Sequence, residues 1–237
     1  RYVAGPKVYR QPSKTLLVLA SPSEAVLERL KKLDVDFKII QPDATLSTDD
    51  VALIDALALP AEFSVPTQWK DAMKQGASIV VHNAGPENQN LLKNLAERQV
   101  ALNAQPIDIW EGRAYRDGFN ELTAGLSQLD LYWKKYETHE SGGAQAVQNK
   151  YKIEDVVYWS ASAPDGKELV YPGALLEIPV GSGRMVLDQV RWQTKNADLD
   201  TKADRYLGAL LSGLDVIIKP FVEARQLPKY VKYDTIN

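Results

Sequence analysis

The first hundred residues alternate between short apolar runs and segments with helical spacing, and this alternation constrains the fold more than any other feature. Short continuous apolar runs suit strands that helices cover on both faces of a parallel sheet. The runs occupy residues 15–20, 37–40, 51–54 and 77–81, and helices are expected at residues 24–35, 66–75 and 87–98. We therefore expect an α/β fold with a mainly parallel sheet between two helical layers.

A second constraint lies at residues 173–192, which are predicted to form two strands joined by a tight glycine turn. Gly181 and Gly183 allow the positive φ angles that a short hairpin turn requires. The Gly-Ser-Gly sequence lacks the lysine of a P-loop and precedes a strand rather than a helix, which favours a hairpin over a phosphate-binding loop. Strands at residues 153–161 and 168–171 are expected to lead into this hairpin, adding an antiparallel region to the parallel sheet.

The domain boundaries follow from the ends of this pattern. Residues 1–14 are predicted to be a linker or lead-in strand, residues 15–218 one α/β domain, and residues 219–237 a C-terminal extension. Asp198 or Asp200 is expected to cap the last helix, whose core-facing stripe consists of Ala203, Leu207, Leu210, Leu211 and Leu214. The polar segment 137–150 is predicted to be a surface loop. Because the chain begins at Arg1 without a signal-peptide pattern, we expect a processed protein or a fragment of a longer one.

The composition excludes several classes of function. Lys and Arg number 28 against 31 Asp and Glu, giving a net charge of −3, so binding to nucleic acid or to a membrane surface is not expected. No apolar run is long enough for a transmembrane helix. The absence of cysteine excludes disulfides, thiolate metal sites and a cysteine nucleophile. With two histidines in the chain, neither a metal site nor a cofactor is expected.

The turn at residues 82–86 follows a predicted strand and precedes a predicted helix, as a nucleophile elbow does. It carries His82 and Asn83 where acyl transfer requires serine or cysteine. His82 could act as a base, but the other histidine, His139, falls in the predicted loop, so no Ser-His-Asp set can be assembled. A structural or vestigial elbow is therefore expected, with a small independent hydrolase that uses His82 as the alternative.

Aromatic and charged residues are interspersed after residue 107. Glycoside hydrolysis uses two carboxylates, and sugars stack on aromatic rings. The possible sugar contacts are Trp110, Glu111, Arg113, Tyr115 and Asp117. Carboxylates are also common on solvated loops and aromatic residues in cores, so we expect packing or domain contact here. A carbohydrate-binding module that uses the aromatic segment 110–136 is the alternative.

Three segments resemble a known family in combination: residues 125–133, residues 172–189 with the sequence PGALLEIPVGSGRMVLDQ, and the helix at 203–214. The chain is similar, over residues 15–218, to the glutamine-amidotransferase-like domain at the C-terminal side of large glycoside hydrolases related to family 2 β-galactosidases and β-glucuronidases. The resemblance implies a flavodoxin-like, three-layer fold. It also implies a parent enzyme that cleaves glycosidic bonds in a separate barrel domain, and it favours a periplasmic or extracellular location.

In class I glutamine amidotransferases the elbow bears a cysteine, and a histidine and a glutamate complete the triad. The matching turn here has His82 and Asn83, so amidotransferase activity is not expected. Related domains in galactosidases make subunit contacts. The resemblance thus implies a non-catalytic accessory domain in carbohydrate metabolism, whose partners are other domains of the same polypeptide or further copies of it.

Overall fold

A computed structural model describes residues 12–60, 62–97, 101–104, 121–126, 157–162, 168–172, 175–190, 192 and 197–218. The candidate sugar-contact residues Trp110, Glu111, Arg113, Tyr115 and Asp117 lie outside the described residues, as do the expected loop at 137–150 and the expected extension at 219–237. No helix in the described part of the chain is long and apolar enough to span a membrane.

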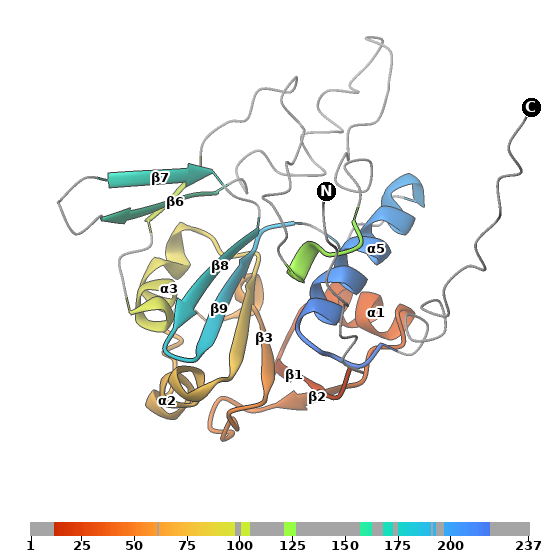
Figure 1. Ribbon diagram of the computed structural model, residues 1–237, viewed down its shortest axis with the longest axis horizontal. Helices are drawn as coiled ribbons and strands as arrows, with labels where there is room; N and C mark the ends of the chain where they lie inside the picture. The colour runs from red at the N-terminus through yellow and green to blue at the C-terminus, as the bar shows by residue number, and fades with distance from the viewer. Residues whose placement is uncertain are drawn as a thin grey trace, which may run out of the picture.

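A six-stranded sheet with the order β2-β1-β3-β4-β9-β8 forms the centre of the molecule (Figure 1). Its strands are β1 (Leu16–Leu19), β2 (Phe37–Ile40), β3 (Val51–Asp55), β4 (Ser78–His82), β8 (Leu175–Val180) and β9 (Gly183–Asp188). Neighbouring strands are parallel from β2 to β9, and β8 pairs with β9 in the antiparallel direction. This is a mixed, flavodoxin-like α/β fold, which confirms the fold class expected from the sequence.

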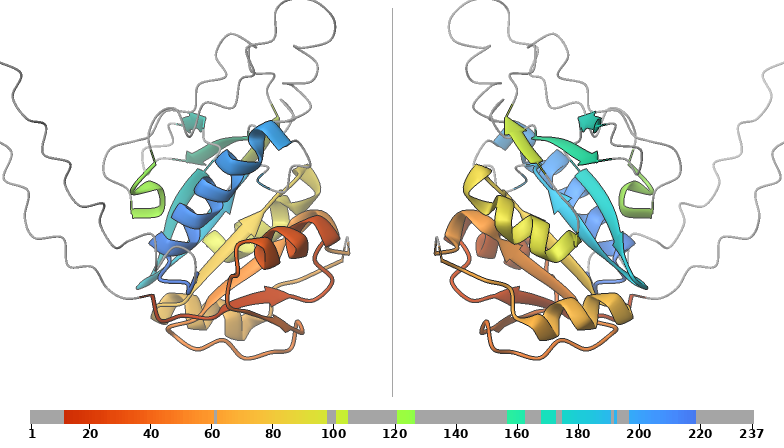
Figure 2. Two further views of the ribbon diagram at one scale, coloured as in Figure 1. Left: turned by 90° about the vertical axis from the view of Figure 1, so that its right-hand side faces the viewer. Right: turned by 90° about the vertical axis from the view of Figure 1, so that its left-hand side faces the viewer.

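Helices cover both faces of this sheet (Figure 2). One face carries α1 (Glu24–Lys32) and α5 (Ala197–Gly213), and the other carries α2 (Thr67–Gln75) and α3 (Gln89–Ala96). Each face has its own cluster of buried apolar side chains, because successive residues of a strand point to opposite sides. The three-layer arrangement expected from the alternation of strands and helices is therefore confirmed.

The turn between β8 and β9 lies against the C-terminal end of α2. Gly181 has a φ of +61°, and the backbone N–H of Ser182 donates a hydrogen bond to the carbonyl of Lys74 at 2.8 Å. A Cβ atom at Gly183 would lie 2.2 Å from the carbonyl oxygens of Met73 and Ala77. The glycine turn expected from the sequence is confirmed, and its close approach to α2 holds β9 beside β4.

The strands that precede the hairpin form a sheet of their own. β5 (Ala101–Ala104), β6 (Val157–Ser162) and β7 (Glu168–Pro172) pair antiparallel in the order β5-β6-β7. The strands expected near residues 153–161 and 168–171 are present and precede the hairpin in the chain, but they pair with β5 and with each other, and β8 remains at the edge of the main sheet. Alternating residues indicate a strand but do not specify its partner.

The start of the last helix also differs from the expectation. Asp198 and Asp200 lie inside α5, which begins at Ala197, so neither is its N-cap residue. Acidic residues are favourable anywhere in the first helical turn because they interact with the positive end of the helix dipole, so their presence does not fix the first residue of the helix. The predicted stripe is confirmed: Ala203, Leu207, Leu210, Leu211 and Leu214 are all buried in the core.

Candidate functional site

Three polar residues close three neighbouring apolar strands at the carboxyl edge of the sheet. Asp55 ends β3, His82 ends β4 and Asp188 ends β9, and the strand register pairs Asp55 with His82 and His82 with Asp188. All three side chains are buried. Ligands of doubly wound α/β folds bind beyond this edge, so this row is the candidate site.

His82 occupies a different place from the one expected. It is the last residue of β4 rather than part of the turn, and its side chain is 0% exposed. The register pair with Asp188 extends the strand by this one residue. The imidazole Nδ1 lies 2.9 Å from Oδ2 of Asp188, and the ring stacks on Trp192 with the centroids 4.3 Å apart. His82 therefore belongs to the core between the sheet and the α1/α5 layer.

Asp188 organises this buried network, accepting hydrogen bonds at both carboxylate oxygens. Its Oδ2 faces His82 and accepts from the indole Nε1 of Trp192 at 2.6 Å. Its Oδ1 accepts from the hydroxyl of Tyr206 at 2.7 Å and from the backbone N–H of Val190 at 3.1 Å. A carboxylate that lies wholly out of water requires this degree of hydrogen bonding.

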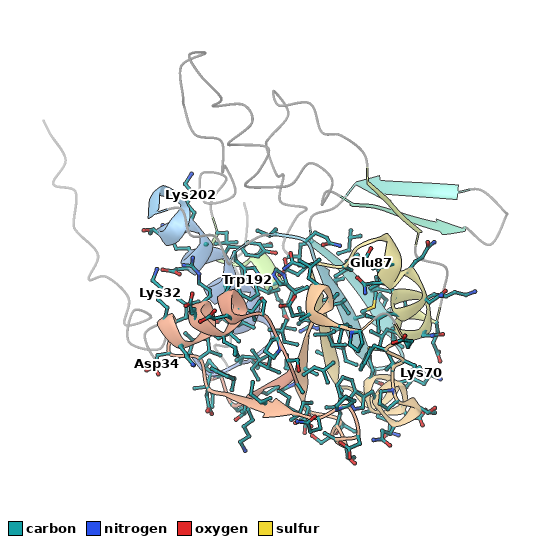
Figure 3. All side chains as sticks on the ribbon, turned by 180° about the vertical axis from the view of Figure 1, so that it is seen from behind. Lys32, Asp34, Lys70, Glu87, Trp192 and Lys202 are labelled. Carbon is teal, nitrogen blue, oxygen red and sulfur yellow. The ribbon has the colours of Figure 1, made fainter. Side chains whose placement is uncertain are left out.

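Tyr206 joins helix α5 to this network. Its burial raises the pKa of the phenol well above the ordinary value, and the adjacent charge and hydrogen bond of Asp188 act in the same direction. The phenol is therefore protonated at neutral pH and serves as a hydrogen-bond donor. Figure 3 shows Trp192 in the interior, whereas Lys70 and Lys202 project outward from their helices.

The elbow itself begins at Asn83, whose φ of 55° lies in the left-handed region. Asparagine adopts this region more readily than most residues. Its backbone N–H donates to the carbonyl of Asp188 at 3.0 Å, and Nε2 of Gln189 donates to the carbonyl of Ala84 at 2.8 Å. These two bonds hold the elbow against the end of β9. The side-chain amide of Asn83 and Oε1 of Gln189 are buried and have no hydrogen-bond partner among the residues that the structure describes.

Asp55 connects the end of β3 to the start of α1. Its Oδ2 accepts a hydrogen bond from the backbone N–H of Ser23 at 2.9 Å, while its Oδ1 is buried and has no partner within the described part of the chain. Ser23 is the N-cap residue of α1 but makes no capping bond with its side chain. The neighbouring Ser21 has a φ of 64°, so left-handed residues follow both β1 and β4 at this edge.

These groups lack one component of a hydrolytic triad. The elbow residues Asn83, Ala84 and Gly85 offer neither a hydroxyl nor a thiol as a nucleophile. The buried imidazole of His82 is engaged with Asp188 and Trp192. Among the residues that the structure describes, no three His, Asp or Glu side chains come together as a metal site would require.

Sequence reasoning identified His82 and Asn83 but missed their partners. The missed residues are Asp55, Asp188, Gln189, Trp192 and Tyr206. One signal was available: Asp55, His82 and Asp188 each follow directly on a run of apolar strand residues. Because the carboxyl ends of parallel strands meet at one edge, polar residues at these positions are brought together.

Comparisons with known proteins assign no family. No family model matches the chain, and no curated protein matches it. A solved structure of a glycoside hydrolase, exo-beta-1,4-mannosidase Op5Man5 from Opitutaceae bacterium strain TAV5, aligns with 85% of this chain at 13% identity and a TM-score of 0.37. The aligned region spans 35% of that enzyme's chain. At this TM-score the likeness assigns neither family nor function, so the functional argument rests on the residues themselves.

Proposed function

We propose that this chain is a non-catalytic accessory module of a multidomain glycoside hydrolase, and that it packs against other domains of the polypeptide or against a second copy of itself. The observation that carries the proposal is the burial of His82 and Asp188. Both side chains are 0% exposed, and Trp192 and Tyr206 hold them within the core.

A catalytic base must come within hydrogen-bond distance of the proton that it removes. His82 is buried on the α1/α5 side of the sheet and contacts Asp188 and Trp192, so its imidazole is not exposed to a substrate at the surface. Asp188 bonds α5, the segment after β9 and the end of β4 together. These bonds support a stabilising role for His82 and Asp188.

The carbohydrate context of the proposal comes from the sequence resemblance. The longest resembling segment, residues 172–189, includes strands β8 and β9. The resemblance therefore covers the hairpin that forms the β8 edge of the main sheet. Related domains make subunit or domain contacts, which is the role proposed for this chain.

The test combines an assay of activity with a measurement of association. The purified chain is incubated with glutamine and with a panel of aryl glycosides, and its oligomeric state is measured by analytical ultracentrifugation over a range of concentrations. The proposal expects no turnover above the buffer blank, together with self-association or binding to the remaining domains of the parent enzyme. Turnover of any substrate, or a chain that is monomeric and does not bind those domains, would overturn it.

A further inference from the structure

Strand β2 forms one edge of the main sheet, and its outer side has no partner strand among the described residues (Figure 1). On its inner side, the backbone carbonyls of Asp36 and Ile40 accept hydrogen bonds from the β1 segment at 2.9 and 2.7 Å. Because consecutive backbone groups of a strand point to opposite sides, the N–H and C=O groups of Phe37 and Ile39 point away from β1. An unpaired strand edge of this kind is a template for pairing with another strand.

The opposite edge of the sheet is less suited to pairing. There β8 carries Pro179, which has no backbone N–H to donate. Its register partner Arg184 directs its own N–H to the carbonyl of Ala77, on the side of β4, so Pro179 faces outward from the sheet. Proline at an outward-facing position protects an edge strand from pairing. Strand β2 has no proline, and its Ile39 side chain is 48% exposed, one of two large apolar side chains left exposed in the described part of the chain.

We infer that β2 pairs in the antiparallel direction with β2 of a second copy of this chain, so that the two main sheets join into one across a twofold axis. This inference rests on the proposed function and names the partner and the surface of its association. In a twofold interface the same surface of both copies meets, so every contact between two different residues occurs twice. The contacts are therefore specified once the register of the two strands is known.

Charge complementarity selects this register. With Phe37 opposite Phe37 of the second copy, Asp36 lies opposite Lys38 on each side of the axis. Asp36 and Lys38 are both exposed, and the hydroxyl of Thr15 donates to the carboxylate of Asp36 at 3.0 Å. Opposite charges directly across two antiparallel strands attract each other, whereas like charges repel. A shift that centres the pairing on Lys38 places two lysines opposite each other and is disfavoured for this reason.

The same register accounts for the exposed apolar residue of β2. Phe37 and Ile39 alternate with the charged residues, so they lie on the other face of the sheet. Phe37 packs against the apolar cluster on the α1/α5 face. In the paired strands Ile39 lies opposite Val35 and diagonally across from Phe37 of the second copy, which reduces its exposure. The pairing thus places apolar residues together on one face and opposite charges together on the other.

The experiment measures self-association of the purified chain by analytical ultracentrifugation at concentrations up to about 1 mM. A weak dimer is expected, because two short strands bury little area. Lys38→Glu places a carboxylate opposite Asp36, and Asp36→Lys places an ammonium group opposite Lys38, so each should raise the dissociation constant at least about fivefold. Ile39→Pro removes an outward N–H group but no hydrogen bond to β1, and it should abolish the dimer.

Two combinations of these substitutions test the register. The double variant Asp36→Lys/Lys38→Glu restores opposite charges across the axis, so its dissociation constant should return to within about twofold of the wild-type value. An equal mixture of the two single variants should form heterodimers in preference to either homodimer, because only the mixed pair opposes unlike charges. Lys93→Glu is the matched control, since Lys93 is exposed on α3, which contacts β8 at the other edge, and this variant should associate as the wild type does.

Three results would overturn the inference. They are a wild-type chain that stays monomeric up to about 1 mM, a dimer that both charge variants leave unchanged while circular dichroism shows them folded, and a double variant that associates no better than the single ones. The charge variants decide the matter even if Ile39→Pro does not fold. A monomer that binds the remaining domains of the parent enzyme would overturn this inference but leave the accessory-module proposal standing, whereas turnover of a substrate would overturn that proposal whatever the state of association.

Discussion

The hydroxyl of Tyr206 donates a hydrogen bond to Oδ1 of Asp188 at 2.7 Å, and this bond ties helix α5 to the end of strand β9. Both residues are essentially excluded from solvent. The bond thus connects the α-helical layer on one face of the sheet with the edge where parallel strands end, and it orients the carboxylate that faces His82.

Replacing Tyr206 with phenylalanine should lower the free energy of unfolding by about 1–3 kcal/mol, because the buried Asp188 loses a donor. Urea denaturation monitored by tryptophan fluorescence measures the change. Thr15→Val is the matched control, since it removes a hydroxyl donor to the carboxylate of Asp36 at an exposed site and should cost under about 1 kcal/mol. Equal losses in the two variants would contradict the importance given to the buried bond.

The stability of the protein should fall with increasing pH above about 10, the ordinary pKa of tyrosine. The pKa of Tyr206 is raised in the folded state, so the unfolded chain releases this proton at lower pH than the native protein does. The contribution of Tyr206 to the free energy of unfolding is complete below the pKa that this residue has in the unfolded chain. Above that pH the contribution decreases by about 1.4 kcal/mol per pH unit while the native phenol stays protonated.

The measurement compares the free energy of unfolding of the wild type and of Tyr206→Phe between pH 9 and pH 11. Other tyrosines and the lysines titrate in both proteins, so the difference between the two isolates Tyr206. The advantage of the wild type should shrink over this range. A constant or growing difference would show that the phenol does not titrate as its burial beside Asp188 requires.

The positions of the main strands and helices could be predicted because each has a local signal, such as the apolar run of β3 or the helix-ending Gly76. The partners of His82 could not be predicted in this way. Asp188 is 106 residues from His82 in the chain, and Tyr206 is a further 18 residues from Asp188. Their contact depends on β9 pairing with β4, which follows from the packing of the glycine turn on α2.

The same limit applies to the small sheet and to the elbow. The alternating residues of β6 identified a strand, but not its pairing with β5 and β7. His82 was predicted to begin the turn, but it is the last residue of β4. Here Asp188 on the neighbouring strand and the indole of Trp192 make a buried polar ending of β4 stable.

Substituting Gly183 with alanine should destabilise the fold by about 1–3 kcal/mol, because the new methyl group would meet the backbone carbonyls of Met73 and Ala77. Gly85→Ala is the control, since its methyl group would meet the side chain of exposed Glu87, which can move aside. A change within about 0.5 kcal/mol is expected.

Thermal melts with and without phosphate check both variants. An unchanged melting temperature for Gly183→Ala would refute the packing of this turn on α2, and phosphate protection of the wild type alone would indicate an anion site.

The ion pair between Arg29 and Asp204 should contribute to the packing of α1 on α5. The guanidinium Nη1 lies 2.5 Å from Oδ1 of Asp204, and the Arg29 side chain is 5% exposed. Asp204→Asn should cost about 1–3 kcal/mol because it removes a negative charge that pairs with the buried Arg29 and with the more exposed Lys32. Glu177→Gln, which breaks the more exposed pair with Arg184, should cost under about 1 kcal/mol in the same denaturation assay. Equal losses of unfolding free energy in the two variants would contradict the larger contribution predicted for the more buried pair.

The most direct test of the whole account measures stability and turnover on the same samples of wild type and His82→Ala. A structural His82 predicts a loss of about 2–4 kcal/mol in the free energy of unfolding, because the substitution leaves a cavity against Trp192 and removes a partner of Asp188. It also predicts no hydrolysis of glutamine or aryl glycosides by either protein. Hydrolysis by the wild type that disappears in His82→Ala, with unfolding unchanged, would contradict the account.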